Sequence, residues 1–187
     1  MQTTSGTPLT AEEADTEAHD HSRAHRRIGL CVAVAVLVYV ADVVTKAVAV
    51  ELLGGQPPVP VFGELLQLRL TRNPGAAFSL GTSATLLLSL VSIGVVLVVA
   101  WLARRVASPV WAVALGLLLA GAGGNLTDRV LRAPAPEQPL QGHVVDFLEL
   151  PNWPVFNVAD SAIVLAAGLI ILQSLRGVQI DGTRAGS

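Results

Sequence analysis

Four long stretches of this chain contain no Asp, Glu, Lys or Arg, and Leu, Val, Ala and Ile dominate them. They are residues 28–41, 73–103, 106–127 and 161–175. A helix needs roughly 20 apolar residues to cross the hydrocarbon core of a bilayer. Charged residues make up 14% of the 187 residues, against about 25% in soluble globular domains. The pattern predicts an integral membrane protein with four transmembrane helices, and it disfavours a soluble enzyme or a disordered chain.

Composition also argues against several kinds of partner. The net charge of −2 provides no basic surface for nucleic acid, so no nucleic-acid partner is expected. The single cysteine, Cys31, lies inside the first apolar stretch, which leaves no disulfide framework or thiolate metal site. His19, His21 and His25 stand in a polar segment without partner ligands, as in a solvated tail. We therefore expect no metal and no cofactor.

The polarity of the chain divides it into a membrane domain and two tails. Residues 1–27 lack apolar periodicity and predict a disordered tail. The membrane domain is expected to cover residues 28–176, followed by a short tail at 177–187. The expected spans are about 28–50, 83–103, 107–127 and 156–175, with long outer loops at 51–82 and 128–155.

The first apolar stretch has an alternative interpretation as a secretory signal peptide. Arg26 and Arg27 would supply its positive end, and residues 47–49 imitate a small-residue cleavage site. The apolar region of a signal peptide does not normally carry residues such as Asp42 and Lys46 just before that site. A membrane span is the favoured interpretation.

Basic residues predict the orientation of the spans, because Lys and Arg concentrate in cytoplasmic segments. They flank the first span at its beginning, join the second span to the third, and follow the fourth. These residues are Arg23, Arg26, Arg27, Arg104, Arg105, Arg176 and Arg184. Both termini are therefore expected in the cytoplasm and the two long loops outside.

The two outer loops differ in pattern. Leu66, Leu68 and Leu70 alternate with polar residues, and this period of two predicts a half-buried strand at the membrane surface. The second loop contains a Pro-rich insert at 133–139, expected to bulge outward, and then a mixed segment from 141 to 153.

Three groups of polar residues interrupt the spans. An ionisable group inside a span costs several kcal/mol unless it is paired or hydrated, so each is a candidate functional residue. Within each group the residues recur three or four positions apart and share one helix face. With the predicted orientation, all three groups lie toward the outer surface. The groups are Asp42 and Lys46; Asn125, Asp128 and Arg129; and Asn157, Asp160 and Ser161.

Structural roles can explain part of this set. Asp42 and Lys46 neutralise each other, so an ion pair that holds the helices together is the favoured interpretation. Asp128 and Arg129 can anchor the end of the third span, with Arg129 on a carboxylate or a lipid headgroup.

Asp146 and Asp160 have no cation beside them in the sequence. Two such carboxylates beside hydrocarbon cannot both ionise freely, so the pKa of one rises and the pair holds one proton. The ionised member can activate water while the other protonates the leaving amine. This is the chemistry of an aspartic peptidase.

Other hydrolytic chemistries lack their residues. The zinc-peptidase motif H-E-x-x-H is absent, and His143 is the only histidine outside the N-terminal tail, which also argues against a Ser–His dyad. His143, Asp146 and Glu149 lie in an irregular segment without the spacing of a known metal motif.

Two functions other than proteolysis would also account for part of this set. A small proton- or ion-coupled transporter would also use clustered carboxylates, but near the midplane and within inverted repeats, and no repeat is visible here. A purely structural bundle subunit would leave Asn73, Asn125 and Asn157 without a purpose. The peptidase remains favoured.

Five blocks of sequence resemble the bacterial lipoprotein signal peptidases, also called signal peptidase II. In order they are Asp42-Val43-Val44-Thr45-Lys46, Asn73-Pro74-Gly75-Ala76-Ala77-Phe78-Ser79, Gly124-Asn125-Leu126-Thr127-Asp128-Arg129, Val144-Val145-Asp146-Phe147 and Phe156-Asn157-Val158-Ala159-Asp160-Ser161. The resemblance implies an aspartic endopeptidase in the bacterial cytoplasmic membrane with its site on the outer face. It would cleave diacylglyceryl-modified prolipoproteins before the lipobox cysteine, with these substrates and membrane lipids as its partners. A monomer is expected.

The resemblance also implies residue roles and a fold. The catalytic pair would be Asp146 and Asp160. The residues expected to bind substrate or brace the site are Asn73, Gly75, Asn125, Asp128, Arg129, Asn157, Ala159, Asp42 and Lys46. The expected fold is an all-α membrane protein with four transmembrane helices, a small extracytoplasmic β-sheet and a short amphipathic surface helix.

Two features depart from the family pattern. Residues 120–123 read Ala-Gly-Ala-Gly where the family usually has Gly-Gly-Ala, a change that keeps small side chains for close helix packing. The interval of 18 residues from Asp128 to Asp146 is longer than is typical because of the Pro-rich insert.

Overall fold

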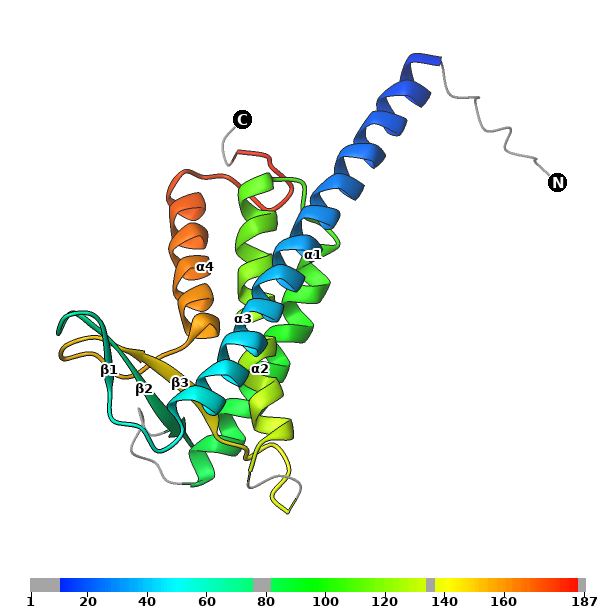
Figure 1. Cartoon of the computed structure of the whole chain (residues 1–187). Coiled ribbons are helices and arrows are strands. Elements are labelled where there is room, and N and C mark those ends of the chain that lie inside the picture. Colours follow the sequence, from blue (N-terminus) through cyan, green and yellow to red (C-terminus); the bar gives the residue numbers. More distant parts are fainter. Residues whose placement is uncertain (1–10, 76–81, 134–136, 185–187) are drawn as a thin grey trace.

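The structure, a computed structural model, describes residues 11–75, 82–133 and 137–184. Within these residues the chain forms four long helices and one small sheet at an end of the helical bundle (Figure 1). The helices are α1 (Ala11–Leu53), α2 (Thr82–Ala103), α3 (Pro109–Leu131) and α4 (Val158–Leu175). Each contains a segment long and apolar enough to cross a membrane: Arg27–Leu53, Thr85–Ala103, Pro109–Leu131 and Val158–Leu175. The predicted class of a four-span helical membrane protein is confirmed.

Helix α1 begins earlier than its apolar segment. It starts at Ala11, inside the stretch 1–27 for which the composition predicts no ordered structure, and its first turns project beyond the bundle (Figure 1). Ala and Glu, which are frequent there, are good helix formers, and extending an existing helix requires no new nucleation. Residues 11–27 are therefore helical, while residues 1–10 lie outside the described part of the chain.

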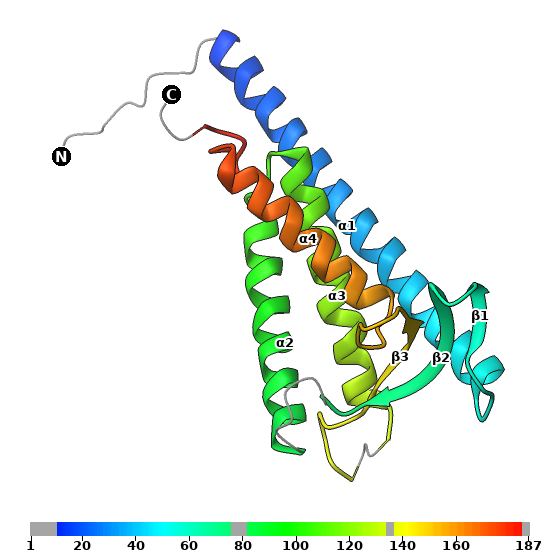
Figure 2. The same ribbon diagram turned by 90° about the vertical axis from the view of Figure 1, so that its left-hand side faces the viewer.

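Helix α3 lies between the other helices and packs against α1, α2 and α4 (Figure 2). Small residues let the backbones approach closely. A Cβ atom at Gly121 would lie 2.6 Å from the carbonyl oxygen of Ala159 in α4, and one at Gly116 would lie 2.6 Å from that of Cys31 in α1. Such contacts replace the hydrophobic driving force that is missing between helices in lipid. The small residues at 120–123 serve the expected close packing.

The sheet has three antiparallel strands in the order β1-β2-β3: Val59–Phe62, Leu66–Asn73 and Val144–Glu149. Strand β2 contains the alternating segment that predicted it. Strand β3 lies in the long connection between α3 and α4, and its pairing places Asp146 opposite Thr71 and Val144 opposite Asn73. The sheet therefore brings the long connection between α1 and α2 together with the one between α3 and α4 at one end of the bundle (Figure 2).

The expected short surface helix is absent from the described residues. In the mixed segment that follows the Pro-rich insert, residues 144–149 form β3 instead. Backbone groups of an extended segment at a membrane surface need partners, and pairing with β2 supplies them. Part of the insert, residues 134–136, lies outside the described residues, so its outward bulge stays a prediction.

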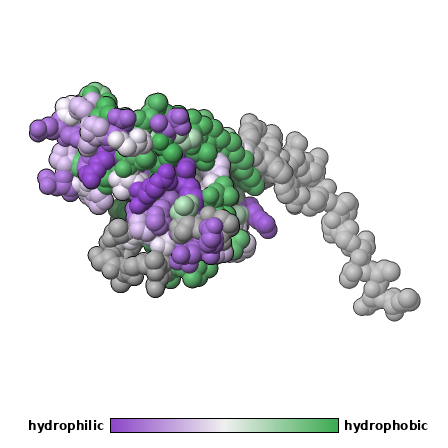
Figure 3. Space-filling model, turned by 60° about the horizontal axis from the view of Figure 1, so that its bottom comes forward, coloured by the Kyte–Doolittle hydropathy of each residue, from purple (hydrophilic) through white to green (hydrophobic). Residues whose placement is uncertain are grey.

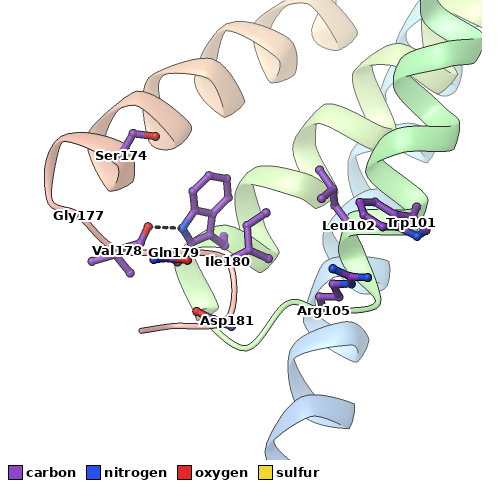
Figure 4. A pocket seen from close by; sticks show the side chains of 10 residues that line it. Trp101, Leu102, Arg105, Ser174, Gly177, Val178, Gln179, Ile180 and Asp181 are labelled. Atoms are coloured by element: carbon purple, nitrogen blue, oxygen red, sulfur yellow. Dashed lines mark hydrogen bonds between the residues drawn. The ribbon is translucent and has the colours of Figure 1, made fainter. Parts of the chain in front are cut away.

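The opposite end of the bundle is closed by the chain after α4. The indole nitrogen of Trp111 donates to the carbonyl oxygen of Val178 at 2.9 Å, and the backbone of Ile180 accepts from Ala107 and Ser108. A cavity of about 490 Å³ lies beside this segment, between the ends of α2 and α4 (Figure 4). The start of α1 and the segment that follows α4 are both at this end, remote from the sheet (Figure 1).

Candidate active site

The polar residues singled out in the sequence meet at the sheet end of the bundle. They come from α1, β2, α3, β3 and the start of α4, five elements that are distant in sequence. Hydrophilic residues gather over this end, beside the hydrophobic surfaces of the helices (Figure 3). The predicted convergence at one end of the helices is observed, and its geometry can be followed residue by residue.

Asp146 lies in β3 with 1% of its surface exposed. Its Oδ2 accepts a hydrogen bond from Nδ2 of Asn73 at 2.9 Å, and its Oδ1 accepts from Nδ2 of Asn157 at 2.6 Å. Successive side chains of a strand alternate, so Asp146 and Phe147 point to opposite faces of the sheet. Phe147 packs with Ala49 and Leu53. The strand therefore separates one polar face from one apolar face.

Both amides that hold Asp146 have fixed orientations. Oδ1 of Asn73 accepts the backbone N–H of Gly75 at 2.8 Å, and Oδ1 of Asn157 accepts that of Asp160 at 2.8 Å. Each NH₂ group must then face Asp146. Gly75 has φ 108°, a conformation that L side chains rarely adopt, so glycine is needed for this turn.

Asp160 lies in the first turn of α4. Its Oδ2 accepts the backbone N–H of Asn157 at 3.2 Å, which completes a capping box with the bond from the Asp160 amide to Asn157. Its Oδ1 accepts from Nδ2 of Asn125 in α3 at 2.8 Å. Asn157 thus touches both carboxylates of the expected pair, one through its side-chain NH₂ and the other through the helix cap.

Lys46 lies at the centre of a buried charged group with 1% of its surface exposed. Its Nζ is 2.8 Å from Oδ2 of Asp42, 3.0 Å from Oδ2 of Asp128 and 3.0 Å from Oδ1 of Asn125. The expected ion pair within α1 is present, but it is part of a larger group that joins α1 to α3. Asn125 connects this group to Asp160.

The carboxylates of Asp42 and Asp128, which pair with Lys46, also accept hydrogen bonds from the backbone next to Asp146 and Asp160. Oδ1 of Asp42 accepts the backbone N–H of Ala159 at 2.9 Å, and Oδ2 of Asp128 accepts that of Val145 at 3.1 Å. Ala159 and Val145 each precede one of the two aspartates. The charged group therefore fixes the chain at both Asp146 and Asp160.

Arg132 was not identified from the sequence. Its Nε pairs with Oδ1 of Asp128, four residues earlier on the same helix. The i,i+4 spacing of an acid and a base was a signal that could have found it.

Arg129 occupies an unusual position. It is 7% exposed, and its Nε and Nη1 atoms have no hydrogen-bond partner among the described residues. The negative charges of Asp146, Asp160 and Asp128 act on its guanidinium. Arg129 therefore brings buried donors to the same region as the two carboxylates.

The pKa of Asp146 is raised to about 6, chiefly by burial and also by the negative charge of Asp160. The hydrogen bonds from Asn73 and Asn157 and the charge of Lys46 act in the opposite direction. Asp146 can therefore hold or release a proton within two pH units of neutrality, which acid–base chemistry requires.

Some candidates do not join this arrangement. Glu149, considered as a metal ligand, pairs with Arg69 at 2.9 Å on the surface of the sheet. The described residues contain no cluster of three His, Cys, Asp or Glu side chains arranged to hold a metal ion. The Ser161 hydroxyl donates to the carbonyl oxygen of Asn157 within its own helix turn.

Comparison with known proteins identifies the family. A family model described as "Signal peptidase (SPase) II" matches residues 34–176, well over half of the chain. The chain belongs to the signal peptidase II family. It is therefore a peptidase, with four helices apolar enough to span a membrane.

Several signal peptidase II relatives cover nearly the whole chain. The "Lipoprotein signal peptidase" of Mycobacterium avium is 47% identical over 170 residues, which cover 91% of this chain and 92% of that protein. Those of Rhodococcus jostii and Streptomyces griseus are 49% and 44% identical, covering 87% and 95% of this chain and 80% and 89% of the relatives.

Two solved structures, both described as a bacterial membrane enzyme determined by the in meso method, are similar in fold to this chain. The first, at 1.9 Å resolution, has a TM-score of 0.69 and 29% identity and covers 79% of this chain and 94% of that one. The second, at 2.3 Å resolution, has a TM-score of 0.67 and 27% identity over 85% and 95%. With its bacterial relatives, the chain is a multi-pass bacterial membrane protein.

Proposed function

We propose that this chain removes the signal peptide from diacylglyceryl-modified prolipoproteins, cleaving before the lipobox cysteine with Asp146 and Asp160 as its catalytic pair. One observation carries the proposal. Two carboxylates from different elements, β3 and α4, are both held by Asn157 and interact electrostatically at one end of a membrane bundle. The Asp146 carboxylate accepts the side-chain NH₂ of Asn157, and the Asp160 carboxylate accepts its backbone N–H.

The proposed reaction uses one proton shared by the pair. The ionised carboxylate accepts a proton from water as the water oxygen attacks the scissile carbonyl carbon. The protonated carboxylic acid donates its proton to the carbonyl oxygen. When the tetrahedral gem-diol intermediate collapses, the C–N bond breaks and the protonated aspartate gives its proton to the amine of the cysteine. The ionised aspartate takes a proton from a hydroxyl of the gem-diol, so the pair again holds one proton.

The surrounding residues have supporting roles in this proposal. Asn73, Asn125 and Asn157 hold the two carboxylates through the hydrogen bonds described above. The buried group of Lys46, Asp42 and Asp128, here called the Lys46 group, fixes the backbone beside both catalytic aspartates. Arg129 is the buried donor available to a carbonyl oxygen of the bound peptide, because Nε and Nη1 have no partner among the described residues. Fixed donors aimed at developing charge stabilise a transition state.

The proposed orientation places the sheet and the catalytic pair on the extracytoplasmic side and both termini in the cytoplasm. Arg104 and Arg105 lie between α2 and α3, and Arg176 follows α4. These ends of the helices are remote from the sheet (Figure 1), as expected for cytoplasmic segments. We further propose that residues 28–176 form the working unit as a monomer, because one chain supplies every residue of the proposed site.

The diacylglyceryl group has a positioning role in this account. Each buried CH₂ group contributes roughly 0.8 kcal/mol to membrane partitioning, so two acyl chains hold the modified cysteine at one depth. The catalytic pair lies at the end of the spans, where that depth would place the scissile bond. Positioning of this kind can account for a large part of a rate enhancement.

The proposal is tested with purified enzyme and one prolipoprotein in two forms, with and without the diacylglyceryl group, at equal surface concentration. Mass measurement of the products should find cleavage before the cysteine and a far slower reaction for the nonacylated form. Added EDTA should change neither rate, because no residue is assigned to a metal. Equal cleavage of both forms contradicts the positioning role, and sensitivity to EDTA contradicts a metal-free pair.

A further inference from the structure

Helix α2 carries two buried hydroxyl groups that the proposed mechanism does not use. Thr85 and Ser89 are 2% and 0% exposed and lie one turn apart on the same face of α2. Polar groups at membrane depth need partners within the protein. Their partners lie outside the helix, in the two outer loops.

Each hydroxyl donates to the carbonyl oxygen of a different loop. The Thr85 hydroxyl donates to Pro74, the residue directly after β2. The Ser89 hydroxyl lies 2.5 Å from the carbonyl oxygen of Leu140 and 3.0 Å from that of Thr85, so the loop carbonyl is its closer acceptor. A serine in a helix usually bonds only the carbonyl four residues earlier, as Ser92 does with Leu88.

These two loop positions flank the paired ends of β2 and β3. Asn73, the residue before Pro74, pairs with Val144 in the sheet and donates its side-chain amide to Asp146. Leu140 begins the short segment that leads into β3 and Asp146.

The backbone of Leu140 needs such support. Its φ is 63°, in the left-handed region that leucine rarely adopts. Residues in this region persist only where their surroundings hold them, and the Ser89 hydroxyl supplies one such contact.

We propose that Thr85 and Ser89 are positioning residues for catalysis, which hold the ends of β2 and β3 so that Asn73 stays directed at Asp146. The inference rests on the proposed function, because it assumes that Asp146 belongs to the catalytic pair. It assigns to Thr85 and Ser89 of α2 the task of fixing the two loops that lead from β2 and into β3.

The test compares hydroxyl-free variants with matched controls. Thr85→Val keeps the shape of threonine without a donor, and Ser89→Ala removes the other hydroxyl. Thr85→Ser and Ser89→Thr keep a donor, and Ser92→Ala removes a hydroxyl that bonds only its own helix. Displacement of a catalytic group by about 1 Å can cost about 100-fold in rate. We expect kcat on acylated prolipoprotein to fall about 10-fold to 100-fold in Thr85→Val and Ser89→Ala and to stay within about twofold of wild type in the controls.

A pH profile separates positioning from general destabilisation. Asp146 is faced by Asp160 from α4, Lys46 from α1, Arg129 from α3 and Asn73 from β2. Only the Asn73 bond depends directly on Pro74. If Thr85→Val loosens that bond, the pKa of Asp146 rises and the alkaline limb of kcat/KM moves to higher pH.

The outcomes distinguish this inference from the proposed function. If wild type fails to cleave the acylated precursor, the proposed function fails. If wild type cleaves and both variants match Ser92→Ala with an unmoved alkaline limb, the positioning role is wrong. The positioning role is also wrong if the rate falls in Thr85→Val and falls equally in Thr85→Ser. It is likewise wrong if the rate falls in Thr85→Val while the alkaline limb of kcat/KM stays at its wild-type pH. The single Thr85 variants decide the matter if Ser89→Ala does not fold.

Discussion

Asn157 and Asp160 hold each other through two reciprocal hydrogen bonds at the start of α4, from the Asp160 amide to Oδ1 of Asn157 at 2.8 Å and from the Asn157 amide to Oδ2 of Asp160 at 3.2 Å. The same Asn157 side chain donates its NH₂ group to Asp146 at 2.6 Å. One residue therefore sets the position of one carboxylate and the start of the helix that carries the other.

This relationship makes Asn157→Ala costly in two ways. Loss of the helix cap should lower the free energy of unfolding by about 1 kcal/mol. Loss of the amide that orients Asp146 should lower kcat by about 100-fold, as misplacement of a catalytic group does. Denaturation in detergent and steady-state kinetics measure the two effects. Ser161→Ala is the matched control, since its hydroxyl bonds the backbone carbonyl of Asn157 and, among the described residues, no other group. Wild-type kcat in Asn157→Ala would contradict the assigned role.

Asn73→Ala should change the pH dependence of the reaction. The Asp146 carboxyl, whose pKa is about 6, releases its proton as the pH rises through that value, so the shared proton is lost above it. The hydrogen bond from Asn73 favours the ionised form and lowers this pKa. Removing the bond should therefore raise the pKa and move the alkaline limb of kcat/KM to higher pH. A limb that stays in place or moves to lower pH would show that Asn73 does not act on Asp146.

Lys46→Met should be strongly destabilising, because it leaves the buried carboxylates of Asp42 and Asp128 without their shared cation. Breaking a buried ion pair by removing one partner costs about 3–5 kcal/mol. Adding Asp42→Asn to this variant should restore part of the loss. Arg69→Ala, which breaks the solvent-exposed pair with Glu149, should cost about 1 kcal/mol or less. Thermal unfolding of the four proteins compares them, and equal losses for Lys46→Met and Arg69→Ala would contradict the structural role of the Lys46 group.

Much of the fold could be predicted because its signals are local. Uncharged stretches locate the spans, and the three- and four-residue spacing of polar groups places Asp42 with Lys46 and Asn157 with Asp160. Strand β2 shows its period of two in the sequence. Extension of α1 back to Ala11 was not predicted, since a general lack of apolar periodicity does not exclude a helix that continues from a neighbouring span.

The contacts that define the site are long-range, and the sequence alone could not supply them. Lys46 meets Asn125 across 79 positions, and Asn73 meets Asp146 across 73. Neither spacing nor composition indicates which way an amide points or which loop carbonyl a hydroxyl such as that of Thr85 will reach. Residues 144–149 formed a strand because β2 lay beside them, and that neighbour is a property of the folded chain.

The most direct test of the central claim is the rate at which Asp146→Asn and Asp160→Asn cleave acylated prolipoprotein, followed by mass measurement of the products. A carboxamide cannot act as acid or base, yet it keeps the shape of the side chain and suits a buried site. Both variants should be expressed and inserted near wild-type levels and yield no product. General acid–base catalysis contributes at least about 100-fold to the rate, so a variant without it should keep at most about 1% of the wild-type rate. A variant that keeps more than this would remove its aspartate from the catalytic pair.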